Sequence, residues 1–158
     1  MKNILNLMLL IVILFLFSDL IYSQTTITKE TINKYVNYWN TGEFIGIKDV
    51  LDQNFELIMS PLYEPASGIE ALKKEIIETR QKFPDFHINI EELFYNDTTG
   101  AGRWLINATS EDGKKINVRG ISLFHFVDGK IKDEWVANGD LLWMQQMGYQ
   151  LVPLGKSK

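Results

Sequence analysis

The hydrophobic period of the chain changes at Pro84, and this change constrains the fold more than any other feature. Before Pro84, apolar side chains recur at helical spacing; after it, apolar and polar residues alternate as in a strand. In residues 27–40 the helical face consists of Ile32, Tyr35, Val36 and Trp39. Helices followed by strands predict an α+β fold.

Three helices are expected in the first half. The first, over residues 27–40, ends near Gly42, and a short second helix covers residues 45–51. Residues 54–60 read as a short strand. Ser67 and Glu70 have the spacing of a capping box, which predicts a third helix that runs to about residue 82.

Four strands are expected after Pro84. They begin near residue 86 and continue over residues 103–110, 116–126 and 131–138. Asp-Gly pairs at 112–113 and 128–129 predict tight hairpins between the last three. The apolar alternation is irregular around Gly120, where we expect a β-bulge. The pattern predicts a curved antiparallel sheet folded over the N-terminal helices, with a pocket between the two layers.

The N-terminal 23 residues have the pattern of a secretory signal peptide. Lys2 precedes an apolar run over residues 4–17, and the small Ser23 marks the expected cleavage site. The run is shorter than the roughly 20 residues of a membrane span, although an uncleaved anchor is the alternative. We therefore expect an exported protein with no stable membrane span after cleavage, a folded domain over residues 24–152 and a flexible tail over 153–158.

Composition excludes several classes of function. The net charge is −4 and no basic run is present, so nucleic acid is not an expected partner. The chain has no cysteine, which excludes thiolate catalysis and cysteine-based zinc sites. Its two histidines, His87 and His125, lie on separate predicted strands and lack the spacing of metal ligands. No metal or organic cofactor is expected.

Four segments, in this order, resemble the SnoaL-like polyketide cyclase (ester cyclase) family of the nuclear transport factor 2-like superfamily. They are YWNTGEF, FPDFHINIEEL, GISLFHFVDGKIKDEW and MQQMG, within residues 35–148. The resemblance implies a cone-shaped fold, with a strongly bent antiparallel sheet wrapped around N-terminal helices and a deep pocket. It also implies homodimers through the sheet and cofactor-free acid/base chemistry on a carbonyl or ester small molecule.

The family's acid/base is an aspartate just after the strand that ends in Glu-Trp, and here the match is displaced by one residue. The family spacing, counted forward from Trp135 or back from Gln145, reaches Gly139, whereas the acid is Asp140. Asp140 is accordingly either the catalytic acid/base in an apolar pocket or the N-cap of the last helix. The first role favours a raised pKa and the second an ionised, exposed carboxylate.

His125 is the second catalytic candidate. It alternates with Phe124 and Phe126, so it lines the pocket only if a bulge at Gly120 turns the strand; otherwise it is a surface residue. Arg119 is an even number of residues from His125 and therefore faces the same side of the strand. In the pocket it would bind an anionic group. His87 is expected to face solvent.

A polar track on the last strand and several aromatic residues complete the predicted site. Glu134, Asn138 and Asp140 share one parity, and they either line the pocket or lie on a solvated face. The residues predicted to bind ligand are Trp39, Met59, Tyr63, Trp104, Arg119, Glu134 and Asn138. The first hypothesis is acid/base chemistry in an apolar pocket, although the displaced aspartate favours a binding domain over a true polyketide cyclase. A non-catalytic domain that binds a small molecule or a partner chain is the alternative, and a domain with a collapsed pocket is the third.

Overall fold

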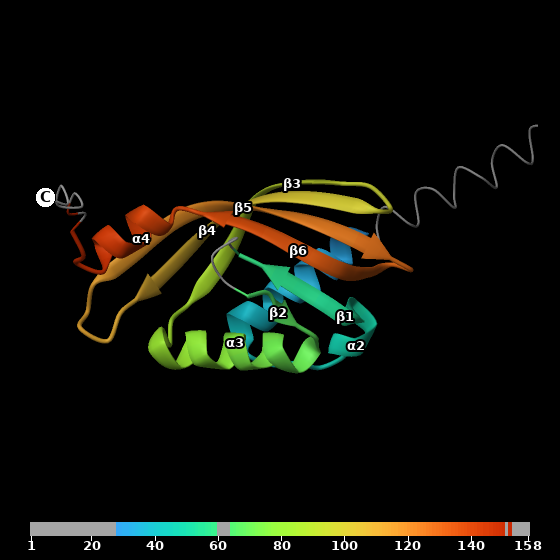
Figure 1. The fold of residues 1–158 in the computed structure, drawn as a ribbon, viewed down its shortest axis with the longest axis horizontal. Helices are drawn as coiled ribbons and strands as arrows, with labels where there is room; N and C mark the ends of the chain where they lie inside the picture. The colour runs from blue at the N-terminus through green and yellow to red at the C-terminus, as the bar shows by residue number, and fades with distance from the viewer. Residues whose placement is uncertain (1–27, 60–63, 151, 153–158) are drawn as a thin grey trace, which may run out of the picture.

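A computed structural model describes residues 28–59, 64–150 and 152 of the chain. A six-stranded sheet in the order β2-β1-β6-β5-β4-β3 lies over the first three helices, and the last helix lies at one end of the sheet (Figure 1). The strands are β1 (Leu51–Ile58), β2 (Ala66–Ser67), β3 (His87–Tyr95), β4 (Thr99–Thr109), β5 (Lys115–Val127) and β6 (Lys130–Asn138). The helices are an N-terminal helix, described over 28–41, α2 (Ile47–Val50), α3 (Ile69–Lys82) and α4 (Asp140–Gln146).

Hairpins connect β3 to β6 as the sequence predicts. β3, β4, β5 and β6 pair in order, each antiparallel to the next. At the turn between β5 and β6, Asp128 and Gly129 have φ angles of 50° and 74°. Two successive positive φ angles are characteristic of the tight turn whose twist matches that of the flanking strands. These hairpins form the long curved part of the sheet.

β1 makes the sheet mixed. It runs parallel to β6 and pairs on its other edge with the short antiparallel β2. This arrangement brings the chain segment that follows the N-terminal helix beside the last strand (Figure 1). The α+β cone predicted from the sequence is confirmed, with one parallel pair added to the antiparallel strands.

The core lies between the inner face of the sheet and the helices. Tyr35 of the N-terminal helix contacts the rings of Phe55 and Phe124, which belong to β1 and β5. Leu72 and Ile76 of α3 are completely buried. Both helices thus bury the apolar faces that their 3.6-residue period predicts.

Two local predictions are wrong. Gly120 pairs in regular register with Trp104 on β4 and with Asn138 on β6, so it forms no bulge. The register shifts lie elsewhere: opposite His125 on β6, within β3 and within β1. Ser67 belongs to β2 and accepts no capping hydrogen bond from the backbone of α3, whose N-cap is Gly68.

Some predictions fall on segments outside the described residues. These are the signal peptide over 1–23, the tail over 153–158 and the placement of Tyr63. Within the described part of the chain, no helix has the length and apolar character needed to cross a membrane.

Candidate functional site

The inner face of β6 lines a cavity between the sheet and the helices. Glu134, Val136 and Asn138 all face this cavity, because residues two apart on a strand share a face. The cavity has a volume of about 290 Å³, near the lower end of the roughly 300–1,000 Å³ typical of ligand pockets. Its larger apolar and aromatic lining residues include Ile32, Tyr35, Trp39, Leu57, Met59, Phe83, Phe86, Trp104, Phe124 and Trp143.

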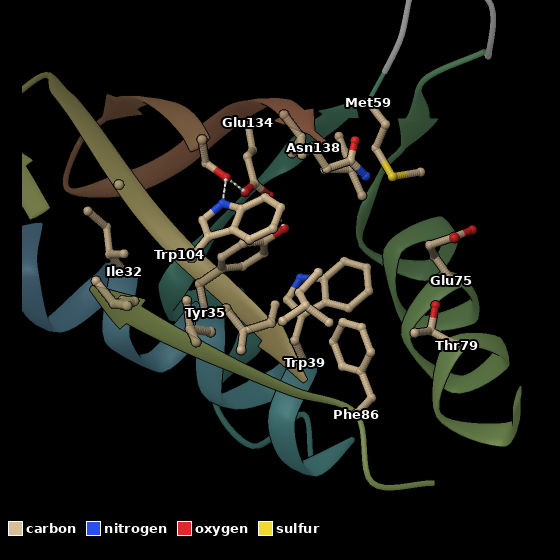
Figure 2. Close-up of a pocket in the computed structure, with 18 of the residues that line it drawn as sticks. Ile32, Tyr35, Trp39, Met59, Glu75, Thr79, Phe86, Trp104, Glu134 and Asn138 are labelled. Atoms are coloured by element: carbon tan, nitrogen blue, oxygen red, sulfur yellow. Dashed lines mark hydrogen bonds between the residues drawn. The ribbon is translucent and has the colours of Figure 1, made fainter. Parts of the chain in front are cut away.

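Glu134 is the centre of a buried hydrogen-bond network (Figure 2). The Tyr35 hydroxyl donates to Oε2 of Glu134, and Ser122 Oγ donates to Oε1 at 2.5 Å. Trp104 Nε1 in turn donates to Ser122 Oγ at 2.8 Å. Four elements therefore hold this carboxyl group in place: the N-terminal helix, β4, β5 and β6. A carboxylate can accept about four hydrogen bonds, so capacity remains on the cavity side.

Burial controls the charge of Glu134. It raises the pKa of this carboxyl to about 7, although the hydrogen bonds from Ser122 and Tyr35 act in the opposite direction. Burial, followed by the nearby Glu134 charge, raises the pKa of the Tyr35 hydroxyl well above its ordinary value. At neutral pH, Tyr35 is thus a fixed proton donor, while Glu134 populates both its protonated and its ionised form.

Asn138 is the second polar group of the cavity wall. Its Oδ1 is buried and accepts no hydrogen bond from any residue that the structure describes. Asn138 and Met59 both line the cavity, and Figure 2 labels them apart from the hydrogen bonds of the Glu134 network. The exposed Lys82 and Asp140 and the half-buried Glu75 also line the cavity and mark its opening.

Asp140 lines the cavity but is exposed. It is the first residue of α4, and the N-cap is Gly139, whose carbonyl accepts the hydrogen bond from the Trp143 amide. No side chain caps this helix. The capping role considered for Asp140 is therefore wrong. Its predicted catalytic role remains a prediction for a carboxylate at the cavity opening.

The structure places His125 and Arg119 on the outer face of the sheet, away from the cavity. His125 is exposed, and its Nδ1 lies 2.7 Å from Asp133 Oδ1. Arg119 forms a two-pronged ion pair with Glu91, at 2.9 and 3.0 Å. With no bulge at Gly120, inward-facing and outward-facing side chains alternate regularly along β5. Asp140 and His125 therefore do not share a site.

The cavity brings together most of the predicted ligand-binding residues. Those that line it are Trp39, Met59, Trp104, Glu134 and Asn138. Residue parity on β6 correctly linked Glu134 to Asn138 but did not show that this face is buried. Tyr35 and Ser122 were missed. Ser122 could have been found from the sequence, because it is a polar residue on the same face of the strand as the apolar Val118 and Phe124.

No three histidine or acidic side chains come together at metal-binding distance within the described residues. The site is a buried carboxyl group in an apolar cavity, held by hydroxyl and indole donors. Such an arrangement can bind a small molecule and exchange a proton with it.

Comparison with known proteins supports this assignment of the fold. The family model for SnoaL-like polyketide cyclase matches residues 29–147. A candidate polyketide cyclase from Bacillus cereus is 28% identical, with a TM-score of 0.68 over 78% of this chain and 81% of that one. A SnoaL-like polyketide cyclase from Agrobacterium tumefaciens is 18% identical, with a TM-score of 0.66 over 77% and 98% of the two chains.

A third similar structure is Bal32a, from a soil-derived mobile gene cassette. It is 17% identical, with a TM-score of 0.67 over 80% of this chain and 99% of that one. No curated protein sequence matches the chain. Because the family model covers most of the sequence and the same fold recurs in these structures, the chain belongs to the SnoaL-like polyketide cyclase family.

Proposed function

We propose that the protein binds a small, mainly apolar molecule in its cavity and transfers a proton at a carbonyl or ester group, with Glu134 as acid and base. The burial of Glu134 carries this proposal. It is 6% exposed and lines the cavity, and no other acidic side chain in the described residues is buried. A general acid/base works best with a pKa near the operating pH, and that of Glu134 is about 7.

The proposed step is the removal of a proton from the carbon next to a carbonyl. The ionised Glu134 takes this proton, and the electron pair of the C–H bond moves toward the carbonyl to form an enolate. Protonated Glu134 then returns the proton to carbon or oxygen. Tyr35 and Ser122 fix the orientation of the carboxyl group throughout. Proton transfer of this kind contributes roughly 10²–10⁴-fold in rate, and ring closure of a keto ester begins with the same step.

A simple ketone tests the proposal. 2-Tetralone has acidic α-protons and is small enough for the cavity, and NMR in D₂O follows their exchange for deuterium. The protein should accelerate this exchange, and Glu134→Gln should remove at least 99% of the acceleration. Glu92→Gln, at an exposed position within β3, is the matched control and should retain it. Equal rates in the wild type and Glu134→Gln would contradict the proposal.

Binding without turnover is the second candidate function. Both oxygens of Glu134 already accept a hydrogen bond, which favours a fixed polar anchor. Under this function, 2-tetralone binds and gains no exchange, and Glu134→Gln changes the affinity alone.

We propose further that the protein is exported. The apolar run and Ser23 support this proposal. Expression of the full chain in a bacterium tests it. Mature protein that begins at residue 24 or 25, found in the periplasm or medium, is the expected result. Full-length protein confined to the cytoplasm would contradict export.

We also propose that two copies associate through the outer face of the sheet. An apolar row crosses neighbouring strands there: Phe94 of β3 pairs with Ala101, which pairs with Leu123 of β5, which pairs with Trp135 of β6. Phe94, Leu123 and Trp135 are at least half exposed. An apolar patch of this kind is typical of a protein interface.

A further inference from the structure

Trp104 gives one of the hydrogen bonds at Glu134 a fixed direction. Its Nε1 donates to Ser122 Oγ at 2.8 Å, and Ser122 Oγ lies 2.5 Å from Glu134 Oε1 (Figure 2). An indole N–H can only donate, whereas a hydroxyl donates one hydrogen and accepts at its oxygen. Of the two neighbours of the Ser122 hydroxyl, only Glu134 can therefore accept its hydrogen.

This direction distinguishes the two protonation states of Glu134. The ionised carboxylate accepts the hydrogen of Ser122, whereas a proton on the lone pair that faces Ser122 would meet the hydroxyl hydrogen. Ser122 is 1% exposed, so bulk water does not offer its hydrogen another acceptor. Tyr35 donates to Oε2 from the other side. A proton that Glu134 takes from a ligand is accordingly held on the lone pairs that face the cavity.

The described surroundings of Glu134 add no charge to this effect. Its neighbours on the two flanking strands are apolar: Leu57 on β1 and Phe124 on β5. Burial raises the pKa of Glu134, and the hydrogen bonds from Ser122 and Tyr35 lower it. The charged side chains of the cavity wall lie at its opening: Glu75, Lys82 and Asp140. The donors, rather than a nearby cation, thus oppose the effect of burial.

We infer that Trp104 is a positioning residue, which acts through Ser122 to favour the ionised form of Glu134 that removes a proton. The inference rests on the proposed function in that Glu134 is the base. Trp104 also lines the cavity, so its ring has two roles. Loss of the indole N–H leaves the Ser122 hydroxyl able to turn and to accept a hydrogen from protonated Glu134. Glu134 should then release its proton at a higher pH.

A pH titration of Glu134 tests this role without any substrate. The ¹³C NMR signal of its Cδ atom reports the ionised fraction, and Glu134→Gln identifies this signal by its loss. The wild-type midpoint should lie at about 7. Ser122→Ala should raise the midpoint by about one pH unit, the size expected for one hydrogen bond to a charged oxygen, and Trp104→Phe by about half a unit.

Replacement of the Trp104 indole by benzothiophene is a second form of this test. It exchanges the N–H group for sulfur and keeps the shape of the ring, so it should give the same upward shift as Trp104→Phe, even if the phenylalanine variant fails to fold. Trp135→Phe, the same substitution on the outer face of the sheet, is the control and should leave the midpoint unchanged. An unchanged midpoint in both Trp104 variants would overturn the inference.

A double-variant cycle shows whether Trp104 acts through Ser122. In the Ser122→Ala background, Trp104→Phe should move the midpoint by less than about 0.2 pH units, because the group that transmits its effect is absent. Equal shifts in the two backgrounds would overturn the inference, since Trp104 would then act on Glu134 by another route.

Exchange of the α-protons of 2-tetralone separates this inference from the proposed function. If both hold, the pH midpoint of the exchange rate rises together with the NMR midpoint in each variant. The expected NMR shifts in a protein that does not accelerate exchange would contradict the proposed function and support the role of Trp104 in the charge of Glu134. A slower exchange in Trp104→Phe with both midpoints unchanged would make Trp104 a purely structural residue and overturn the inference.

Discussion

Gly120 of β5 lies directly opposite Trp104 of β4, and the indole ring fills the space where a side chain at position 120 would be. A β-carbon built on Gly120 would lie 2.1 Å from Trp104 Cη2. The same ring donates a hydrogen bond to Ser122, which donates to Glu134. The absence of a side chain at one position of β5 thus allows the ring of Trp104 to reach the network that holds the carboxyl group.

Gly120→Ala should accordingly displace Trp104. Overpacking in a filled core costs about 1–3 kcal/mol, and the lost hydrogen bond adds to this cost. Urea unfolding should show a fall in the free energy of unfolding of at least 2 kcal/mol, and near-UV circular dichroism should show an altered tryptophan signal. Gly102→Ala is the control, because its β-carbon would lie 3.5 Å from the nearest atom, an ordinary contact. A normal tryptophan signal in Gly120→Ala would contradict the role given to this glycine.

The pH dependence of stability should reflect the buried carboxyl group. The folded state holds the pKa of Glu134 at about 7, above the value of about 4.3 for an unfolded chain. Between these values the folded state binds the extra proton, so the contribution of Glu134 to stability is fully present below pH 4.3 and is lost as pH rises through 7. The full loss is about 4 kcal/mol, of which roughly 3 kcal/mol falls between pH 5 and pH 8. Urea unfolding at pH 5 and pH 8 should show this loss in the wild type and not in Glu134→Gln.

The control for this experiment is Glu92→Gln, which removes an exposed carboxylate and should parallel the wild type. Four other carboxyl groups have lowered pKa values: Asp52, Asp85, Glu91 and Asp112. Their stabilising effect is lost only as pH falls below this window, so they do not change the comparison of pH 5 with pH 8. An identical pH dependence in wild type and Glu134→Gln would place the ionised form of Glu134 in a well-solvated environment.

The architecture was largely predictable because local signals determine it. The two Asp-Gly turns and the alternation of Phe124, His125 and Phe126 are patterns of residues that are neighbours in the sequence. Such patterns are sufficient to predict the hairpins and the strands. The parallel pairing of β1 with β6 was not predicted, since it joins segments about 80 residues apart. No local pattern specifies such a pair.

The candidate site was predictable in part, for the same reason. Parity placed Glu134 and Asn138 on one face, but only the packed structure shows that this face is the buried one. Tyr35 bonds to Glu134 across 99 positions of sequence. On its own, Tyr35 reads as a core residue of an amphipathic helix. His125 and Arg119 could line the pocket only if β5 had a bulge at Gly120. The structure has no bulge there, and the glycine instead leaves space for the ring of Trp104.

Asn138→Leu should stabilise the protein without ligand. The substitution removes a buried oxygen that lacks a partner in the described structure and places apolar atoms in an apolar wall, a gain of about 1–2 kcal/mol. Differential scanning calorimetry should show a higher Tm than in the wild type. Asn107→Leu is the control, since Asn107 accepts a hydrogen bond from Asn117 on the outer face, and no rise is expected. A lower Tm for Asn138→Leu would mean that the amide contributes to the stability of the empty protein.

Leu123→Lys should dissociate the proposed dimer. It places a charge at the centre of the apolar row that joins Phe94 to Trp135, while the inner face is unaffected. Light scattering after size-exclusion chromatography should change from the mass of a dimer to that of a monomer, with an unchanged circular dichroism spectrum. Asn117→Lys, on the same face nearer the start of β5, should remain dimeric. A monomeric wild type at 100 µM would contradict association through this face.

Either Glu134 or Asp140 could be the proton-transfer group, and the two assignments predict opposite effects for one pair of variants. Asp140 is exposed at the cavity opening, where solvent can replace its carboxylate, whereas Glu134 is buried among fixed donors. Exchange of 2-tetralone α-protons should therefore fall at least 100-fold in Glu134→Gln and less than threefold in Asp140→Asn. His125→Ala, on the outer face, should match the wild type. The reverse order of the first two variants would assign proton transfer to Asp140 and leave Glu134 as a polar anchor.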